Sequence, residues 1–373
     1  CIHAAKIKRI AERNYYIFFE ACSRYLCSMI NVDYLIVGQG IAGTLLSYEL
    51  MKANKSVMVL DKPNSHAIAS LVAGAVINPL AGKNWQPSLA QQLYIPQALA
   101  TYKALGQQFQ TDIVKETTLF VFHESGEKQN EAIGRLQTVS NEKDLQNQFS
   151  YQFGAAQISP LYLVDAQTLL SMWRQYLIAQ NSFRLENFEH NALLEKQDGI
   201  TYEDIQAKKI IFCEGAAESE NPLFKKLPFT KNRGEALLLH IPDLKEQQIY
   251  HQGNLRLVPK GDGLFWCGSN YQWNFENLWP DETWRSKTLG QLKQWLTVPF
   301  TVADHIVAER PTTAGQFPLI GSHPDFPRTY IFNGLGTRGF SSGPYWAKHL
   351  ALQLEDESYV IPDYDTLRLH KLF

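Results

Sequence analysis

Residues Val32 to Asp61 read VDYLIVGQGIAGTLLSYELMKANKSVMVLD, and this stretch decides the fold. Apolar runs over 34–37 and 57–60 flank a glycine-rich turn and a helical pattern. Strand, turn, helix and strand within about 30 residues, ending on an acid, are typical of a dinucleotide-binding βαβ unit.

Three glycines form the turn as Gly-x-Gly-x-x-Gly. Gly38 lets the chain turn off the strand, Gly40 lets the backbone approach a pyrophosphate, and Gly43 lets the helix pack close to the strand. The first helical residues, Ile41 and Ala42, begin a helix whose free N–H groups and partial positive charge favour phosphate. We therefore expect the pyrophosphate of a dinucleotide at this turn.

An acid follows at the expected distance. Asp61 lies 18 residues after Gly43, where a carboxylate can accept hydrogen bonds from ribose hydroxyls. An acid there disfavours a 2′-phosphate, so NADP is not expected. Lys62 either contacts the adenosine phosphate region or is solvated. The alternative for the whole stretch is a structural βα turn with Asp61 as a strand-end cap.

The composition bounds the class of protein. A length of 373 residues allows two domains, and a hydrophobic content of 45% is ample for a core. The net charge of −2 provides no global basic field to recruit nucleic acid or an acidic membrane. No apolar run approaches the ~20 residues of a membrane span. The 5 cysteines show neither metal-site nor disulfide spacing, which favours a reducing, cytoplasmic setting.

Residues 1–28 look foreign to the fold. Glu20 and Arg24 interrupt what could have been a signal core, so a signal peptide is not expected. Met29 lies just before the first predicted strand. We interpret Met29 as the natural initiator and residues 1–28 as an upstream extension; the alternative is a genuine amphipathic arm.

Further along the chain, apolar runs and helical patterns alternate. The patterns predict helices over 86–110, 165–179 with Asp165 as N-cap, and 344–354, and strands over 117–122, 210–213, 236–240, 263–267 and 330–333. A second glycine-rich turn, with Gly334, Gly336 and Gly339, follows the last strand. The nucleotide-binding fold is therefore predicted to be split between the two ends of the chain, with a β-rich domain inserted.

Five segments in order carry a resemblance to the D-amino-acid oxidase superfamily of flavoproteins, the group with glycine oxidase and sarcosine oxidase. The first is the βαβ unit, 38–61. The second, ASLVAGAVINP at 69–79, is similar to the family's A-S-x-x-A-A-G-x-x-x-P, and the third, KIIFCEGA at 209–216, to V-V-x-A-x-G-A. The fourth, LVPKGDG at 257–263 with Gly268, is similar to Y-x-x-P-R-x-D-G-x-x-x-x-G. The fifth runs over 310–344.

The resemblance implies a fold and a cofactor. The fold is α/β (α+β), a split Rossmann-like FAD-binding domain with an inserted β-rich substrate domain. The FAD-binding domain is expected to comprise 29–85, 155–220 and 300–373, and the substrate-binding domain 86–154 and 221–299. The dinucleotide is expected to be FAD rather than NAD, bound without a covalent link because Cys213 and Cys267 do not lie where a flavin linkage is expected.

The same resemblance implies which other residues bind the cofactor. Ser70 and Gly74 are expected to line the flavin, and Gly215, with its neighbours in 214–216, to close over the adenine side. The last glycine-rich turn is expected to pass over the flavin with the residues Gly336, Thr337, Arg338, Gly339 and Phe340.

Enzymes of this kind move a hydride from the carbon beside an amine nitrogen to the flavin, so no metal or protein nucleophile is expected. Arg310 and Arg338 are the candidate catalytic residues, because a guanidinium can hold a substrate carboxylate bidentately. The alternative is a structural role, for Arg310 an ion pair. No catalytic base is assigned; Tyr271 and His251 are candidates.

Two features of the fifth segment keep other functions open. GTRGFSSGP at 336–344 is most similar to a turn in the oxidoreductase domain of the bifunctional tRNA wobble-uridine modification enzyme. Gly315 stands where the family pattern has Asp, which puts the local turn in doubt. The leading hypothesis is an FAD-dependent amine oxidoreductase acting on a small amino acid or N-substituted glycine. The alternatives are a stand-alone enzyme acting on carboxymethylaminomethyl-uridine in tRNA, and a non-catalytic FAD-binding protein. The oligomeric state is not predicted.

Overall fold

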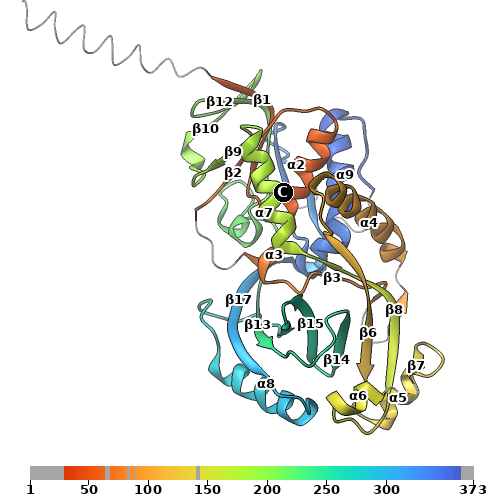
Figure 1. Ribbon diagram of the computed structural model, residues 1–373. Helices are drawn as coiled ribbons and strands as arrows, with labels where there is room; N and C mark the ends of the chain where they lie inside the picture. Colours follow the sequence, from red (N-terminus) through yellow and green to blue (C-terminus); the bar gives the residue numbers. More distant parts are fainter. Residues whose placement is uncertain (1–28, 64–67, 82–84, 88, 140–142, 363–373) are drawn as a thin grey trace, which may run out of the picture.

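The computed structural model describes residues 29–63, 68–81, 85–87, 89–139 and 143–362. The interpretation of residues 1–28 as an extension lies outside the described residues. Two large sheets organise the described chain. Figure 1 shows the first sheet with helices α2, α4, α7 and α9 in the upper half, and the second sheet with α8 below it. Strand β3 and the short helix α3 lie between the two halves.

The first sheet has eight strands in the order β10-β11-β12-β1-β2-β9, with β19 paired to β12 and β18 to β19. The bounds are β1 Ile30–Val37, β2 Val57–Asp61, β9 Phe183–Leu185, β10 Leu193–Lys196, β11 Gly199–Tyr202, β12 Ile205–Phe212, β18 Leu319–Ser322 and β19 Thr329–Asn333. Strand β1 pairs in parallel with β2 and with β12, and β12 pairs in parallel with β19. Strands from three distant parts of the chain therefore build one parallel core.

The predicted βαβ unit is confirmed. Helix α2, Ile41–Lys52, connects the parallel strands β1 and β2. Residues 34–37 and 57–60 are at most 5% exposed, as expected for central strands covered on both faces. The mixed α/β fold with a split, Rossmann-like nucleotide-binding sheet is also confirmed.

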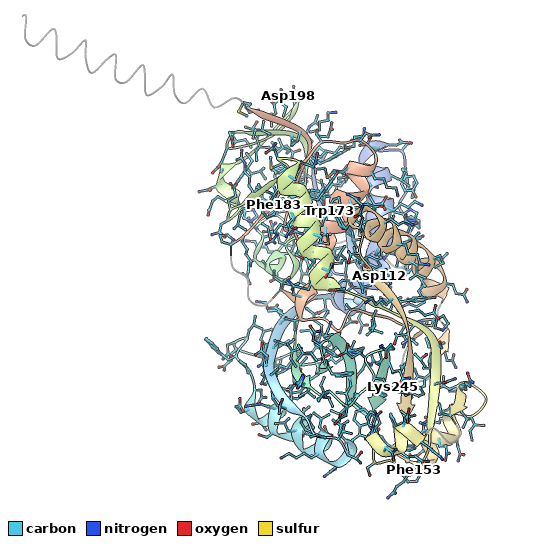
Figure 2. The ribbon with its side chains drawn as sticks, viewed as in Figure 1. Asp112, Phe153, Trp173, Phe183, Asp198 and Lys245 are labelled. Carbon is cyan, nitrogen blue, oxygen red and sulfur yellow. The ribbon has the colours of Figure 1, made fainter. Side chains whose placement is uncertain are left out.

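Three further helices share one core cluster with α2: α4 Leu89–Phe109, α7 Ala166–Ala179 and α9 Gly339–Glu355. Trp173 of α7, labelled in Figure 2, is 1% exposed and donates its indole N–H to Ser47 Oγ at 2.8 Å. The predicted N-cap of α7 is confirmed, because Asp165 accepts a hydrogen bond from the Thr168 N–H at 3.0 Å.

Helix α9 begins at Gly339, five residues before the predicted start at Pro344. Proline lacks the N–H that would bind the carbonyl of Phe340, four residues earlier. The hydroxyl of Tyr102, on α4, donates to that carbonyl at 2.8 Å instead. A contact from a distant helix thus permits the proline inside α9, and this contact cannot be read from the local pattern.

The second sheet has nine strands in the order β17-β13-β16-β15-β14-β6-β8-β3, with β7 paired to β8. The bounds are β3 Val76–Ile77, β6 Val114–Phe122, β7 Gln137–Val139, β8 Ala155–Val164, β13 Phe229–His240, β14 Gln248–Gln252, β15 Leu255–Gly261, β16 Leu264–Gly268 and β17 Thr301–Thr313. Helix α8, Glu282–Trp295, packs on one face of this sheet. The opposite face is directed toward the nucleotide-binding half.

The remaining elements are short. They are α3 Ala69–Val72, α5 Gly126–Ala132, α6 Lys143–Gln148, strands β4 Leu80–Ala81 and β5 Gln86–Pro87, and the 3₁₀ turns η1 His190–Ala192, η2 Gly215–Glu220, η3 Ala314–Gln316 and η4 Gly336–Arg338. None of the helices in the described residues has the length and apolarity that a membrane crossing requires.

The exact domain boundaries stay a prediction. If domains are drawn by sheet membership, β8 and β17 go with the second sheet, although the predicted boundaries put 155–164 and 301–313 in the FAD-binding domain. Helix α4 goes with the first sheet, because it shares the core of α2, although the predicted boundaries put it in the substrate-binding domain. Drawn this way, the substrate-binding part extends to about residue 313.

Candidate active site

A cavity of about 550 Å³ lies where the carboxyl ends of the strands of the first sheet meet the second sheet. Its lining comes from both halves of the molecule. From the first half it includes the ends of β1, β2 and β12, and from the second it includes parts of β13, β15, β16 and β17. The carboxyl edge of such a sheet is where nucleotide ligands bind in open α/β folds.

The three predicted glycines have the geometry that the motif implies. Gly38 has φ +99°, and a Cβ there would lie 2.5 Å from the carbonyl oxygen of Cys213. A Cβ on Gly43 would overlap the carbonyl oxygen of Gly38, so only glycine lets α2 approach the turn this closely. A Cβ on Gly40 would meet only Ser70 Oγ, at 3.4 Å. Gly38 and Gly40 line the cavity, whereas Gly43 acts behind them.

Helix α2 presents an open N-terminus to the cavity. Its N-cap is Gly40, which has no side chain to cap the helix, and no acid lies in its first turn. The N–H of Ile41 donates to Ser70 Oγ at 3.0 Å, and Ile41 and Ala42 both line the cavity. Unsatisfied N–H groups and the helix dipole favour an anion here, so the residues present fit the pyrophosphate of FAD.

Asp61 is held in position at the end of β2. One carboxylate oxygen accepts the Gln39 N–H at 3.2 Å, and the other is paired with the guanidinium of Arg174 from α7. Burial raises the pKa of the Asp61 carboxyl. Each carboxylate oxygen can accept more than one bond, so Asp61, which lines the cavity beside Lys62, can still accept ribose hydroxyls.

The loop after β12 closes another side of the cavity. Gly215 has φ +61°, and its carbonyl accepts a hydrogen bond from Asn333 at 2.9 Å. Beneath the loop, Glu218 is fully buried and accepts hydrogen bonds from the Glu214 N–H, Asn221 and Asn333. Burial raises the pKa of Glu218. This buried network holds Gly215 against the cleft.

The segment that contains α3 lies against the second sheet. Trp266 of β16 donates its indole N–H to the Val72 carbonyl at 2.8 Å, and Lys260 donates to the Ala73 carbonyl at 3.2 Å. A Cβ on Gly74 would lie 3.4 Å from the Trp266 ring, so the glycine permits this close approach. Ser70 and Gly74, which are predicted to line the flavin, both line the cavity.

Arg310 lies on the second sheet and lines the same cavity. Its Nη2 donates to Ser269 Oγ at 2.8 Å and to the Asn270 carbonyl at 3.1 Å, and its Nη1 donates to Asn232 Oδ1. Its guanidinium lies 4.7 Å from the centre of the Tyr271 ring. These acceptors are neutral, so they orient the guanidinium without cancelling its charge.

The last glycine-rich turn contributes part of the lining of the cavity. Gly336, Thr337, Gly339 and Phe340 line the cavity. Arg338 lies instead in the wall of a second cavity, of about 700 Å³, and its Nη2 donates to the Gln316 carbonyl at 2.7 Å. The two candidate arginines are therefore not in the wall of one cavity.

The structure also shows where the two candidate bases lie, and the backbone conformation of Gly315, the glycine that stands where the family pattern has Asp. Tyr271 lines the first cavity and is 59% exposed, whereas His251 lines the second. Burial, and secondarily the charge of Arg256, lowers the pKa of His251 to about 3, so its imidazole is neutral near pH 7 and a weak base. Gly315 has φ +81°, a conformation that favours glycine, so the local backbone accounts for this departure.

Arg256 is the cavity residue that the sequence reasoning missed. It lines both cavities. A signal for it was present, because the family pattern Y-x-x-P places tyrosine three residues before Pro259, where this chain has arginine. No group of three or more His, Cys, Asp or Glu side chains that could hold a metal ion occurs among the described residues.

A glycine-rich turn at a helix N-terminus, an acid at the end of β2 and an arginine-bearing sheet line one cavity, an arrangement that fits a flavin-dependent oxidoreductase. A family model described as FAD dependent oxidoreductase (DAO) matches residues 33–353. The chain therefore belongs to this family, and its cofactor is FAD.

Relatives and solved structures agree with this placement. The tRNA 5-methylaminomethyl-2-thiouridine biosynthesis bifunctional protein MnmC of Shewanella oneidensis is 25% identical over 202 residues, which cover 43% of this chain and 28% of that protein. The chain thus spans under a third of the curated relatives that it matches. Glycine oxidase from Geobacillus kaustophilus has a TM-score of 0.73 at 18% identity, covering 91% of this chain and 99% of that one. Iminodiacetate oxidase from Chelativorans sp. BNC1 also has a TM-score of 0.73, at 19% identity, covering 89% and 98%.

Proposed function

We propose that the protein oxidises the C–N bond of a small amino acid or an N-substituted glycine. The observation that carries the proposal is Arg310, a cation held by neutral oxygens in the wall of the cavity that the FAD-binding residues also line. FAD, when bound, would supply the hydride acceptor for the carbon beside the amine nitrogen, and loss of a hydride from the neutral amine leaves an iminium ion.

Arg310 has the role of orienting the substrate. Ser269 and Asn270 hold its guanidinium, so little side-chain entropy is lost when it binds a carboxylate. A carboxylate held on this sheet directs the neighbouring carbon toward the nucleotide-binding half. Fixing the reacting carbon in this way is the main contribution that the protein makes to such a reaction.

Apolar side chains have the role of excluding water. Trp266 and Phe340 are 8% and 6% exposed, and they line the cavity from opposite halves of the molecule. A dry site protects an imine from premature hydrolysis. His251 is not assigned as a base, because its pKa of about 3 makes its imidazole a weak base.

The comparisons support this class of substrate. The names of the two structurally similar oxidases give glycine and iminodiacetate as what those proteins act on.

Two buried thiols support non-covalent binding of FAD. Burial raises the pKa of Cys267 to about 12 and also raises the pKa of Cys213, so both thiols stay protonated and unreactive.

Anaerobic mixing tests the proposal. The FAD-loaded protein would be mixed with glycine, sarcosine, iminodiacetate, D-amino acids and proline while the flavin absorbance is followed. We expect bleaching by at least one of them. Arg310→Met should raise the substrate concentration that gives half-maximal bleaching by about tenfold or more, because a charge-assisted pair between the guanidinium and the carboxylate is lost. The control Arg285→Met, on the surface of α8, should behave as the wild type. A loaded protein that no amine bleaches would contradict the proposal.

A second candidate function is supported by the match to MnmC and by the turn at 336–344. On this alternative the substrate is a carboxymethylaminomethyl-uridine in tRNA, whose carboxylate would bind Arg310 in the same way. It predicts tRNA binding that weakens steeply with salt. Bleaching by the modified nucleoside within tRNA, with none by free amino acids, would favour this alternative.

A further inference from the structure

Arg256 lies at the junction of the two cavities. Its neighbours on β15, Leu255 and Leu257, point into the core that α8 covers, so Arg256 points to the opposite face of the sheet. On that face it lines the first cavity, as Arg310 does, and also the second, as Arg338 does.

The guanidinium of Arg256 has no counter-charge among the residues that the structure describes. No hydrogen bond or ion pair joins it to another of them, and its Nε is buried without any partner. Burial lowers the pKa of the guanidinium, while Tyr271 acts in the opposite direction. Burying a cation without a partner costs several kcal/mol in general, so an unmatched one facing a cavity indicates a place for an anion.

Two carboxylates in the walls of these cavities have partners of their own. Glu131, in the wall of the second cavity, forms an ion pair with Lys128 at 2.7 Å. Glu235, in the wall of the first, accepts hydrogen bonds from Asn270 and from the Asp281 N–H. The cross-strand neighbour of Arg256 is His251, and the pKa of about 3 keeps it neutral near pH 7.

Arg256 and Arg310 lie on the same sheet in a fixed relationship. Strands β15 and β17 are three steps apart in the order β17-β13-β16-β15, about 14 Å across the sheet at the usual spacing of strands, and the register also offsets the two arginines along the strands. The Arg310 side chain extends over Gly234 on β13, and so toward β15. Tyr271 interacts electrostatically with both guanidinium groups and acts to raise the pKa of each.

We propose that Arg256 is a second carboxylate-binding residue, and that the substrate is a dicarboxylic amine. This inference rests on the proposed function. The first carboxylate, beside the carbon that is oxidised, binds Arg310. The second carboxylate binds Arg256, which lines both cavities.

Two unreactive ligands test the inference on the FAD-loaded wild-type protein. Thiodiacetate carries two carboxylates on a thioether, and (methylthio)acetate carries one. Neither contains an amine to oxidise. Binding would be measured by the perturbation of the flavin absorbance and by calorimetry. We expect thiodiacetate to bind at least tenfold more tightly, because it alone can pair with both guanidinium groups.

Variants assign the preference to one residue. Arg256→Met keeps the length of the side chain and removes the charge, so it should abolish the preference for the diacid and leave the affinity for (methylthio)acetate within about twofold. Arg135→Met removes a charge from the wall of the same second cavity and serves as the matched control. It should keep the preference.

Three results would overturn the inference: equal binding of both ligands by the wild type, equal losses for both in Arg256→Met, or loss of the preference in Arg135→Met. The first needs no variant, so a failure of Arg256→Met to fold would not prevent the test. If monocarboxylic amines bleach the flavin and the diacid is not preferred, this inference fails and the proposed function stands. If neither ligand binds and no amine bleaches the flavin, both fail.

Discussion

The guanidinium of Arg310 lies over Gly234 on the neighbouring strand, so closely that a Cβ on Gly234 would overlap Nη2 and Cζ. Gly234→Ala should therefore displace the guanidinium from Ser269 and Asn270 while the strands remain paired. We expect the affinity for (methylthio)acetate to fall by about tenfold to a hundredfold, the range for one charge-assisted pair. The affinity for FAD should not change. Both would be measured by titration.

A second glycine provides the control. Gly290 lies on the exposed side of α8, and a Cβ there would meet nothing within 4 Å. Gly290→Ala should leave ligand binding unchanged and stabilise the protein by up to about 1 kcal/mol, because alanine favours the helix. If Gly234→Ala also left ligand binding unchanged, Arg310 would not be the carboxylate anchor.

Two glycines of the phosphate-binding turn should respond differently to alanine. A Cβ on Gly40 meets only Ser70 Oγ, so Gly40→Ala should fold normally and lose affinity for FAD by about tenfold or more. A Cβ on Gly43 overlaps backbone, so Gly43→Ala should lower the free energy of unfolding of the FAD-free protein by about 1–3 kcal/mol or more. Urea unfolding and FAD titration separate the two effects. A stable Gly43→Ala protein would contradict the packing role.

The neutral His251 should make the protein sensitive to acid. Its pKa is lowered from 6.5 to about 3 in the folded protein, so below pH 6.5 the unfolded chain binds a proton that the folded chain does not. This linkage removes stability as the pH falls from about 6.5 toward about 3, and accounts for up to about 2 kcal/mol at pH 5. His251→Gln should therefore lose less stability than the wild type between pH 7 and pH 5. The free energy of unfolding of each protein would be measured by urea unfolding across this pH range. Equal losses in the wild type and in His251→Gln would refute the prediction.

The charge of its cross-strand neighbour also affects the pKa of His251. Arg256 is the second cause of the lowered pKa, after burial. Arg256→Met should raise the pKa of His251, which NMR titration of the imidazole protons would measure. An unchanged pKa would mean that burial alone keeps this histidine neutral.

The sequence predicts the nucleotide-binding half better than the other half, and the reason is physical. The turn at Gly38, Gly40 and Gly43 is a local structure, since its spacing, its helix and its acid lie within one unit of the chain. The position of Arg256 in the cavity wall, by contrast, depends on the pairing of four strands, β13 to β16. Their pairing brings one face of the sheet against the segment after β2. Within the nucleotide-binding half as well, one feature is not local: the hydroxyl of Tyr102, on a distant helix, permits the early start of α9. Contacts between distant segments decide these features, and local patterns do not contain them.

A buried carboxylate supports the loop that holds Arg310. Glu235 is fully buried and accepts hydrogen bonds from Asn270 at 3.1 Å and from the Asp281 N–H at 2.8 Å. It also forms an ion pair with Arg233 at 3.2 Å. Glu235 therefore connects the Arg310 acceptor on Asn270 to the start of α8.

Glu235→Leu should leave the buried Arg233 without its ion-pair partner and lower the free energy of unfolding by about 3–5 kcal/mol. Ligand affinity should fall too, because Asn270 loses its support and no longer orients Arg310. Urea unfolding would measure the first effect and (methylthio)acetate titration the second. Breaking the exposed ion pair of Lys231 by Glu220→Gln is the matched control, and should cost less than about 1 kcal/mol. Equal losses in the two variants would show that the buried pair contributes no more than a surface one.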